Sequence, residues 1–188
     1  MAYRAFLDAN VLVPARVRDV LLTLADVGAF APIWSPEVFE EVDRHLPAAM
    51  YPASRDHLFR EMDRAFPEAS TTWPEPLHIE VAAHVNSHDH HVMAAALWAH
   101  ADVLVTDDQR LADEVTPLID CQSPGLFVTY ALDAVGTEAL SALLEMARQR
   151  WSRGDQTDGE LADRLRAWMR SLGWDGAASE LARLLGAP

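Results

Sequence analysis

The stretch RAFLDANVLV, residues 4–13, places a carboxylate at the point where a short apolar run stops. Ala5-Phe6-Leu7 predicts a buried strand, and Asp8 follows it directly. A lone ionised carboxylate is costly to bury unless another group pairs with it. Asp8 is therefore expected either to cap a turn or to help hold a cation.

Strand and helix patterns alternate after this stretch, which predicts an α/β protein with a parallel sheet covered by helices. Gly28 is placed to end the first helix, and Ser35 is placed to cap the second, with Pro36 at its first position. The expected strands are 5–7, 30–34, 102–106 and 115–121, with 77–81 as a strand or a lead-in. The expected helices are 17–27, 36–46, 54–66 and 87–100, and the pattern from 123 to 185 is helical throughout.

Composition limits the classes of protein to which the chain can belong. Half of the 188 residues are hydrophobic, which is enough for a core, and no apolar run is long enough to cross a membrane. The single cysteine and the lack of a signal-peptide pattern favour a cytoplasmic protein. The net charge of −14 argues against a general nucleic-acid coat.

Charge also divides the chain into two parts. Residues 1–134 hold 8 Arg and 21 acidic residues, whereas residues 135–188 hold 7 Arg and 8 acidic residues, and there is no Lys anywhere. We therefore expect a first domain over 1–134 and a helical C-terminal extension over 135–188.

Acidic residues end two of the expected strands. Asp8 follows the first, and Thr106, Asp107 and Asp108 follow the strand at 102–106. The carboxyl ends of parallel strands meet at one edge of a sheet, where binding sites form. Taken singly, each Asp is more typical of a turn or a helix cap. As a set, they predict a shared site.

Helices supply further acidic candidates. Asp89 shares a helix face with apolar residues and is expected to point toward the core from the first turn. In the helix after Ser35, Glu41 and Asp43 lie at opposite edges of the apolar stripe, and helix geometry does not choose between them. Clustered carboxylates raise one another's pKa unless a cation is present. Oxygen ligands suit Mg²⁺ or Mn²⁺, which can activate water and hold a phosphodiester.

Three stretches, in this order, resemble the PIN-domain ribonucleases, and in particular the VapC-type toxins of bacterial toxin–antitoxin pairs. They are FLDANVLV (6–13), RDVLLTLADVGAFAPIWSPEVFEEV (18–42) and DHHVMAAALWAHADVLVTDDQRL (89–111). The resemblance covers roughly residues 3–133 and implies a three-layer α/β/α fold with a central, mostly parallel sheet. It also implies a metal-dependent endoribonuclease that uses Mg²⁺ or Mn²⁺, dimerises and is inhibited by a cognate antitoxin protein.

The resemblance implies a role for individual residues. Glu41 matches the helix acid of the family and Asp108 the fourth acid, with Asp107 as its rival. Asn10 and Thr106 match supporting polar positions of the pocket. The metal-binding acids implied by the resemblance are Asp8, Glu41, Asp89 and Asp108.

Two features depart from the family pattern. His88, His90 and His91 surround Asp89, and we interpret them as a solvent-facing helix start rather than a zinc site. The acidity of the chain requires local arginines for RNA binding, whose alternative role is ordinary surface pairing. The candidates are Arg16, Arg18 and Arg44 near the expected site, and Arg148, Arg150, Arg153, Arg164, Arg166 and Arg170 in the extension.

Other enzyme classes fit poorly. A haloacid-type phosphatase needs an Asp where Asn10 stands, and both it and a receiver domain need a Lys. A dinucleotide-binding fold needs glycines in the first turn, and Cys121 shows no nucleophile elbow. The serious alternative is a PIN-like module that binds RNA or protein without cleaving it.

Overall fold

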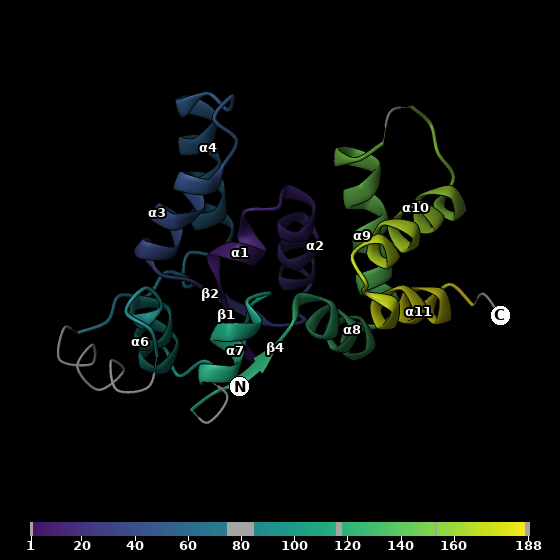
Figure 1. The fold of residues 1–188 in the computed structure, drawn as a ribbon. Coiled ribbons are helices and arrows are strands. Elements are labelled where there is room, and N and C mark those ends of the chain that lie inside the picture. The colour runs from purple at the N-terminus through teal and green to yellow at the C-terminus, as the bar shows by residue number, and fades with distance from the viewer. Residues whose placement is uncertain (1, 75–84, 116–117, 153, 187–188) are drawn as a thin grey trace. The chain divides into compact units, whose positions relative to one another are not determined.

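The computed structural model describes residues 2–74, 85–115, 118–152 and 154–186. These residues form a four-stranded sheet and ten helices, and the expected α/β class is confirmed (Figure 1). The chain divides into two compact units, one made of Met1–Arg18 and Ala31–Gln122 and the other of Asp19–Phe30 and Ser123–Pro188.

All neighbouring strands of the sheet are parallel, and their order is β2-β1-β3-β4. Phe6 lies opposite Ile33 on one side and Leu104 on the other. The side chains of Phe6 and Leu104 are fully buried, as a strand covered on both faces requires. The strands are β1 (Arg4–Leu7), β2 (Ala31–Ile33), β3 (Val103–Val105) and β4 (Asp120–Gln122).

The helices of the first unit follow the strands. Ser35 Oγ accepts a hydrogen bond from Val38 N (3.3 Å) and Pro36 begins the helix, which confirms the expected start. Helix α2 (Ala15–Asp26) runs from the first unit into the second. The other described helices of the first unit are α1 (Ala9–Leu12), α3 (Pro36–His45), α4 (Pro52–Ala65), α6 (His90–Trp98) and α7 (Gln109–Val115).

Two expected boundaries are wrong. Val115 is the last residue of α7 and does not begin a strand, because Leu111 and Val115, four residues apart, bury one helical face. The last strand is therefore the short β4 alone and does not extend back to Val115. The helix expected from residue 87 begins at His90, since the chain turns before it, with Asp89 N donating to Asn86 O (2.9 Å). The possible strand at 77–81 lies outside the described residues.

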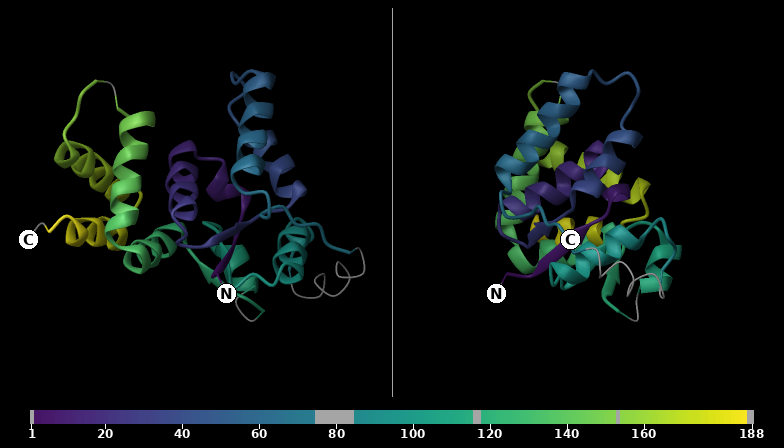
Figure 2. Two further views of the ribbon diagram at one scale, coloured as in Figure 1. Left: turned by 180° about the vertical axis from the view of Figure 1, so that it is seen from behind. Right: turned by 90° about the vertical axis from the view of Figure 1, so that its left-hand side faces the viewer.

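Aromatic packing joins α3 to α4, which lie side by side in all views (Figures 1 and 2). The rings of Phe39 and Phe59 are 4.8 Å apart, and Phe39 stacks on the fully buried Trp34 with centroids 5.4 Å apart. Aromatic pairs of this kind add stability beyond the area that they bury. This packing fixes the helix that carries Glu41.

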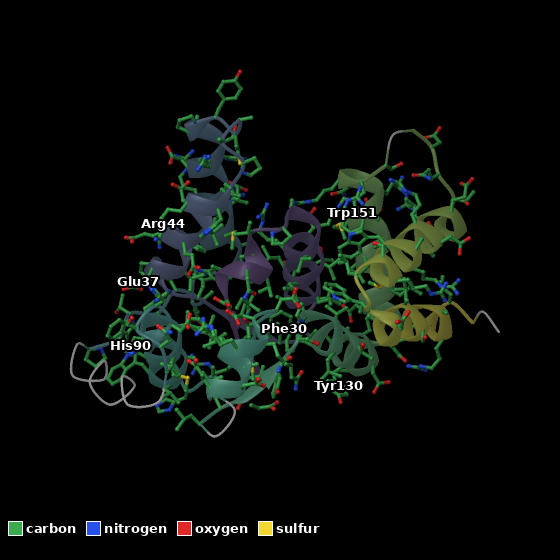
Figure 3. All side chains as sticks on the ribbon, viewed as in Figure 1. Phe30, Glu37, Arg44, His90, Tyr130 and Trp151 are labelled. Carbon is green, nitrogen blue, oxygen red and sulfur yellow. The ribbon has the colours of Figure 1, made fainter. Side chains whose placement is uncertain are left out.

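The second unit is helical, as expected for the end of the chain. Gly28, with a φ of 77°, ends α2 as predicted, and its N–H donates to Ala25 O (2.9 Å). Asp19 accepts hydrogen bonds from Trp151 Nε1 (3.0 Å) and from Arg150 (2.8 Å) (Figure 3). The described helices of this part are α8 (Pro124–Val135), α9 (Thr137–Arg150), α10 (Asp158–Ser171) and α11 (Asp175–Leu184).

The compact units group α8 and most of α2 with the C-terminal helices. The domain boundary expected after residue 134 stays a prediction, because compactness alone does not test independent folding. Across the described residues, every helix is too short or too polar to span a bilayer.

Candidate functional site

The strand order places a topological switch point between β1 and β3. The chain leaves β1 toward β2 on one side and reaches β3 on the other side. Binding sites of open parallel sheets form outside the carboxyl ends of the strands at such a point. Asp8 directly follows β1 and Thr106 directly follows β3, and Asp8 N donates to Val105 O (3.1 Å).

Asp8 is a buried carboxylate with a defined orientation. Its side chain caps α1, where Oδ1 accepts from Ala9 N (2.7 Å), and Oδ2 accepts from Thr106 Oγ1 (2.7 Å). Asp8 is 5% exposed and Thr106 is 3% exposed. Asp8 is therefore a helix cap, as its position after a strand suggests, and it is also held at the edge of the sheet.

Asn10 and Thr106 hold the two strand ends together. Asn10 Nδ2 donates to Thr106 Oγ1 (2.7 Å), and Asn10 Oδ1 accepts from Asp107 N (3.0 Å). Thr106 Oγ1 also accepts from Asp108 N (3.1 Å). The residues expected to support the acids thus fix the orientation of Asp8 and the backbone at Asp107 and Asp108.

The pKa of Asp8 shows which other acids lie near it. This pKa is raised to about 6, mainly by burial; the hydrogen bonds from Thr106 and Ala9 lower it, and the charges of Glu41 and Asp89 add smaller contributions that raise it. Like charges act in this way only across short distances in a poorly solvated region. Asp8, Glu41 and Asp89 therefore share one electrostatic environment.

Helix geometry left open whether Glu41 or Asp43 is the candidate acid of α3, and in the structure the two side chains turn toward different neighbours. Asp43 turns toward α4, where its Oδ1 lies 3.1 Å from Arg55 Nη1. Glu41 turns toward α6, where its Oε2 lies 3.6 Å from His91 Nε2. Because the charge of Glu41 also raises the pKa of Asp8, Glu41 is the acid of α3 that lies within electrostatic reach of that carboxylate.

Asp89 and Asp108 are joined by a residue that the sequence did not single out. Arg110 Nη2 lies 2.8 Å from Asp89 Oδ2 and 3.4 Å from Asp108 Oδ2. Asp108 Oδ1 accepts from the backbone N–H groups of Arg110 (2.9 Å) and Leu111 (3.1 Å) at the start of α7. Asp107 is exposed, so Asp108 is the better placed of the two neighbours.

The four expected acids are thus connected, though by two kinds of link. Asp8, Glu41 and Asp89 interact through their charges, and Asp89 reaches Asp108 through Arg110. Within the part of the chain that the structure describes, no three His, Cys, Asp or Glu side chains come close enough together to hold a metal ion. The chemistry of the four donors nevertheless fits a hard divalent cation, because all are carboxylates and the charges of two raise the pKa of a third.

The solvent-facing interpretation of the histidines is right for only one of them. His88 is exposed, but His90 is buried and its Nε2 lies 2.9 Å from Val85 O. His91 directs a buried Nε2 at Glu41. The helix begins at His90, and this shift turns His90 and His91 inward.

The arginines near the site differ in exposure. Arg18 is buried, and its guanidinium donates to Leu12 O (2.5 Å) and Val13 O (3.4 Å), which satisfies carbonyls at the end of α1. Arg16 is exposed. Arg44 is exposed on α3 (Figure 3), with its Nε donating to Glu40 O (3.2 Å). Arg16 and Arg44 are therefore more exposed residues than Arg18.

Most described arginines of the C-terminal helices contact other residues of their own unit. Arg148 pairs with Glu145 and Asp158, and Arg164 donates to Trp151 O (2.8 Å). Arg150 pairs with Asp19, as described above, and Arg166 Nη1 lies 3.3 Å from Asp163 Oδ1. Ordinary pairing accounts for these charges. Arg170 is exposed, and Arg153 lies outside the described residues.

Cys121 lies in β4, close enough to Asp8 for the charge of that carboxylate to affect the pKa of the thiol. Burial, and then the charges of Asp120 and Asp8, raise the pKa of this thiol to about 11. It therefore stays protonated at neutral pH and is a poor nucleophile.

Arg110 is the main residue that the sequence analysis missed. Its spacing of four residues from Glu114 gave a signal, because side chains four residues apart lie on one face of a helix. Comparison with known proteins adds no assignment: the chain matches no protein-family model, no curated protein and no solved structure.

Proposed function

We propose that this chain is a divalent-metal-dependent endoribonuclease of the PIN-domain type, with the three-layer α/β/α arrangement of that fold. Its proposed reaction is hydrolysis of phosphodiester bonds in single-stranded or looped RNA. The observation that carries the proposal is the buried Asp8 carboxylate at the switch point of the sheet, where Thr106 holds it and the charges of Glu41 and Asp89 act on it. The resemblance of the sequence to VapC-type toxins suggests the reaction.

The carboxylates of Asp8, Glu41, Asp89 and Asp108 would hold the Mg²⁺ or Mn²⁺. When bound, the ion would supply a polarised water for attack and positive charge to stabilise the phosphate. The charges of Glu41 and Asp89 contribute to the raised pKa of Asp8, and a bound cation would offset them.

Supporting residues keep the acids oriented. Thr106 Oγ1 donates to Asp8 Oδ2, and Asn10 holds Thr106 from the other side. Hydrogen bonds that fix the carboxylates around a metal raise both affinity and rate. Arg16 and Arg44, which are exposed residues of the same unit, are the candidates for RNA phosphate contacts.

The proposed biological role is that of the toxin in a toxin–antitoxin pair. It includes a cytoplasmic location, a homodimer and inhibition by a separately encoded antitoxin protein. These three points rest on the resemblance of residues 3–133 alone.

A second function has one observation in its favour. Among the described residues, the acids do not converge closely enough to bind a metal, and Arg110 contacts two of them. A PIN-like module that binds RNA or protein without cleavage would keep such an arrangement permanently. Its thermal stability would not respond to Mn²⁺, whereas a competent site gains stability as ligand is added.

Glu41 and Asp43 offer a matched test of the proposal, because they lie on one helix and face different partners. Cleavage of a pool of short RNAs would be followed with Mn²⁺ for the wild type, Glu41→Gln and Asp43→Asn. We expect Glu41→Gln to lower the rate by at least about 100-fold, by analogy with the loss of a group that stabilises the transition state, and Asp43→Asn to keep most of it. Equal activity of all three proteins would refute the assignment.

A further inference from the structure

Arg110 contacts three acids on different parts of the first unit. Besides Asp89 and Asp108, its Nη1 lies 3.3 Å from Glu114 Oε1 one turn along α7. The Arg110 side chain is 49% exposed, but that of Asp89 is only 16% exposed. The contact with Asp89 joins residues 21 positions apart and is therefore part of the tertiary structure.

The position of this guanidinium is unusual for a surface arginine. Asp89 and Asp108 both belong to the proposed metal site, so Arg110 places a positive charge on two of its four ligands. In the metal-free protein, Arg110 thus neutralises repulsion that a divalent ion would otherwise relieve.

We propose that Arg110 is a counter-cation that competes with the divalent ion for Asp89 and Asp108 and thereby sets the metal affinity of the site. This inference rests on the proposed function. Asp89 Oδ2 accepts a direct hydrogen bond from Nη2 at 2.8 Å, so a divalent ion on the Asp89 carboxylate would lie beside the positive guanidinium. Two cations on one carboxylate also repel each other.

Glu114 can remain paired with the guanidinium of Arg110 after the contact with Asp89 is broken. It accepts from Arg110 on one oxygen, and its other oxygen accepts from Asn86 N (3.0 Å), which holds the carboxylate in place. Arg110 can therefore leave Asp89 and remain paired beside the site. Displacement then costs the contacts with Asp89 and Asp108 and spares the one with Glu114.

Mn²⁺ binding to the full chain tests this competition without any cleavage reaction. The free-ion signal in electron paramagnetic resonance would give the Kd for the wild type, Arg110→Ala, Arg110→Gln and Arg110→Lys. Arg64→Ala is the matched control, because it removes one charge from an exposed pair with Glu61 (3.7 Å) on α4. Thermal melts of all five proteins would confirm that each is folded.

We expect Arg110→Ala and Arg110→Gln to bind Mn²⁺ about fivefold more tightly, the factor that corresponds to the loss of a half-exposed ion pair. Arg110→Lys keeps the charge and should stay near the wild type, and so should Arg64→Ala. A merely structural role for Arg110 would instead weaken binding in Arg110→Ala, and this result would overturn the inference. Unchanged binding in every variant would overturn it while leaving the proposed function intact. Absence of Mn²⁺ binding in all five proteins would overturn both.

Discussion

Replacement of Asp8 by asparagine is expected to stabilise the metal-free protein at neutral pH, although Asp8 lies at the centre of the proposed site. The pKa of this carboxyl is about 6 in the folded chain, against an ordinary value of 3.8. Between these values the folded protein binds a proton that the unfolded chain has released. Stability therefore falls as the pH rises from about 4 to 6 and stays low above that range.

The size of the effect follows from this difference in pKa. Ionisation of Asp8 in the folded state costs about 3 kcal/mol at pH 7. Asparagine avoids this cost but weakens the hydrogen bond from Thr106, and a bond to a charged acceptor is worth about 1.5 to 3 kcal/mol when it is lost entirely. Because asparagine keeps a carbonyl oxygen that can still accept this bond, the Asp8→Asn variant should be about 1 kcal/mol more stable than the wild type at pH 7 in EDTA.

Urea denaturation between pH 5 and pH 8 would measure both the sign and the pH dependence. The advantage of Asp8→Asn should grow by about 1.4 kcal/mol over this range, because the wild type loses its proton. Addition of Mn²⁺ should stabilise the wild type more than the variant. A variant that is less stable at pH 7, or an advantage that does not change with pH, would refute the argument that Asp8 is buried among other acids.

Five further substitutions, two of them controls, test three particular contacts by urea denaturation. Thr106→Val should lower the free energy of unfolding by about 2 kcal/mol, because it removes the hydroxyl that bonds to Asp8 and Asn10. Thr106→Ser keeps a hydroxyl and should lower it less, so equal losses would contradict this reasoning. Ser35→Ala should cost about 1 kcal/mol through loss of the cap of α3, and no loss would mean that the cap is not needed. Gly125→Ala should cost about 1 to 3 kcal/mol, since the new methyl would meet Trp174 Cδ1 at 2.5 Å. Gly159→Ala in α10 meets nothing nearer than 4.0 Å and should be neutral or stabilising, so equal effects of the two would count against the packing argument.

Much of the parallel sheet was predictable from local sequence. The strands at Arg4–Leu7 and Val103–Val105 are short apolar runs that end in acids, and their burial on both faces leaves little ambiguity. Gly28 and Ser35 marked a helix end and a helix start through backbone chemistry that acts within a few residues. These features depend only on residues that are close together in the sequence, so they could be predicted from it.

The short helices were harder to predict. The four-residue helix after Asp8 has no full period of apolar spacing, and the seven-residue helix ending at Val115 has only two buried positions. The apolar run from Val115 therefore looked like a strand. Tertiary packing, rather than local preference, stabilises helices of this length.

The site required long-range information. The choice between Glu41 and Asp43 depends on whether Arg55 or His91 lies opposite, and neither contact follows from helix geometry. The burial of His90 depends on where its helix begins. The role of Arg110 depends on a turn that brings Asp89 to it from 21 residues away.

The most direct test of the account is cleavage of total cellular RNA by the purified chain, in EDTA, Mg²⁺ or Mn²⁺, beside Asp8→Asn. The account predicts discrete products that require the metal and are absent with Asp8→Asn, even though that variant is folded and more stable. Equal cleavage by Asp8→Asn, or cleavage that continues in EDTA, would contradict the carboxylate site. No cleavage by a folded wild type under any metal would favour the module that binds without cutting.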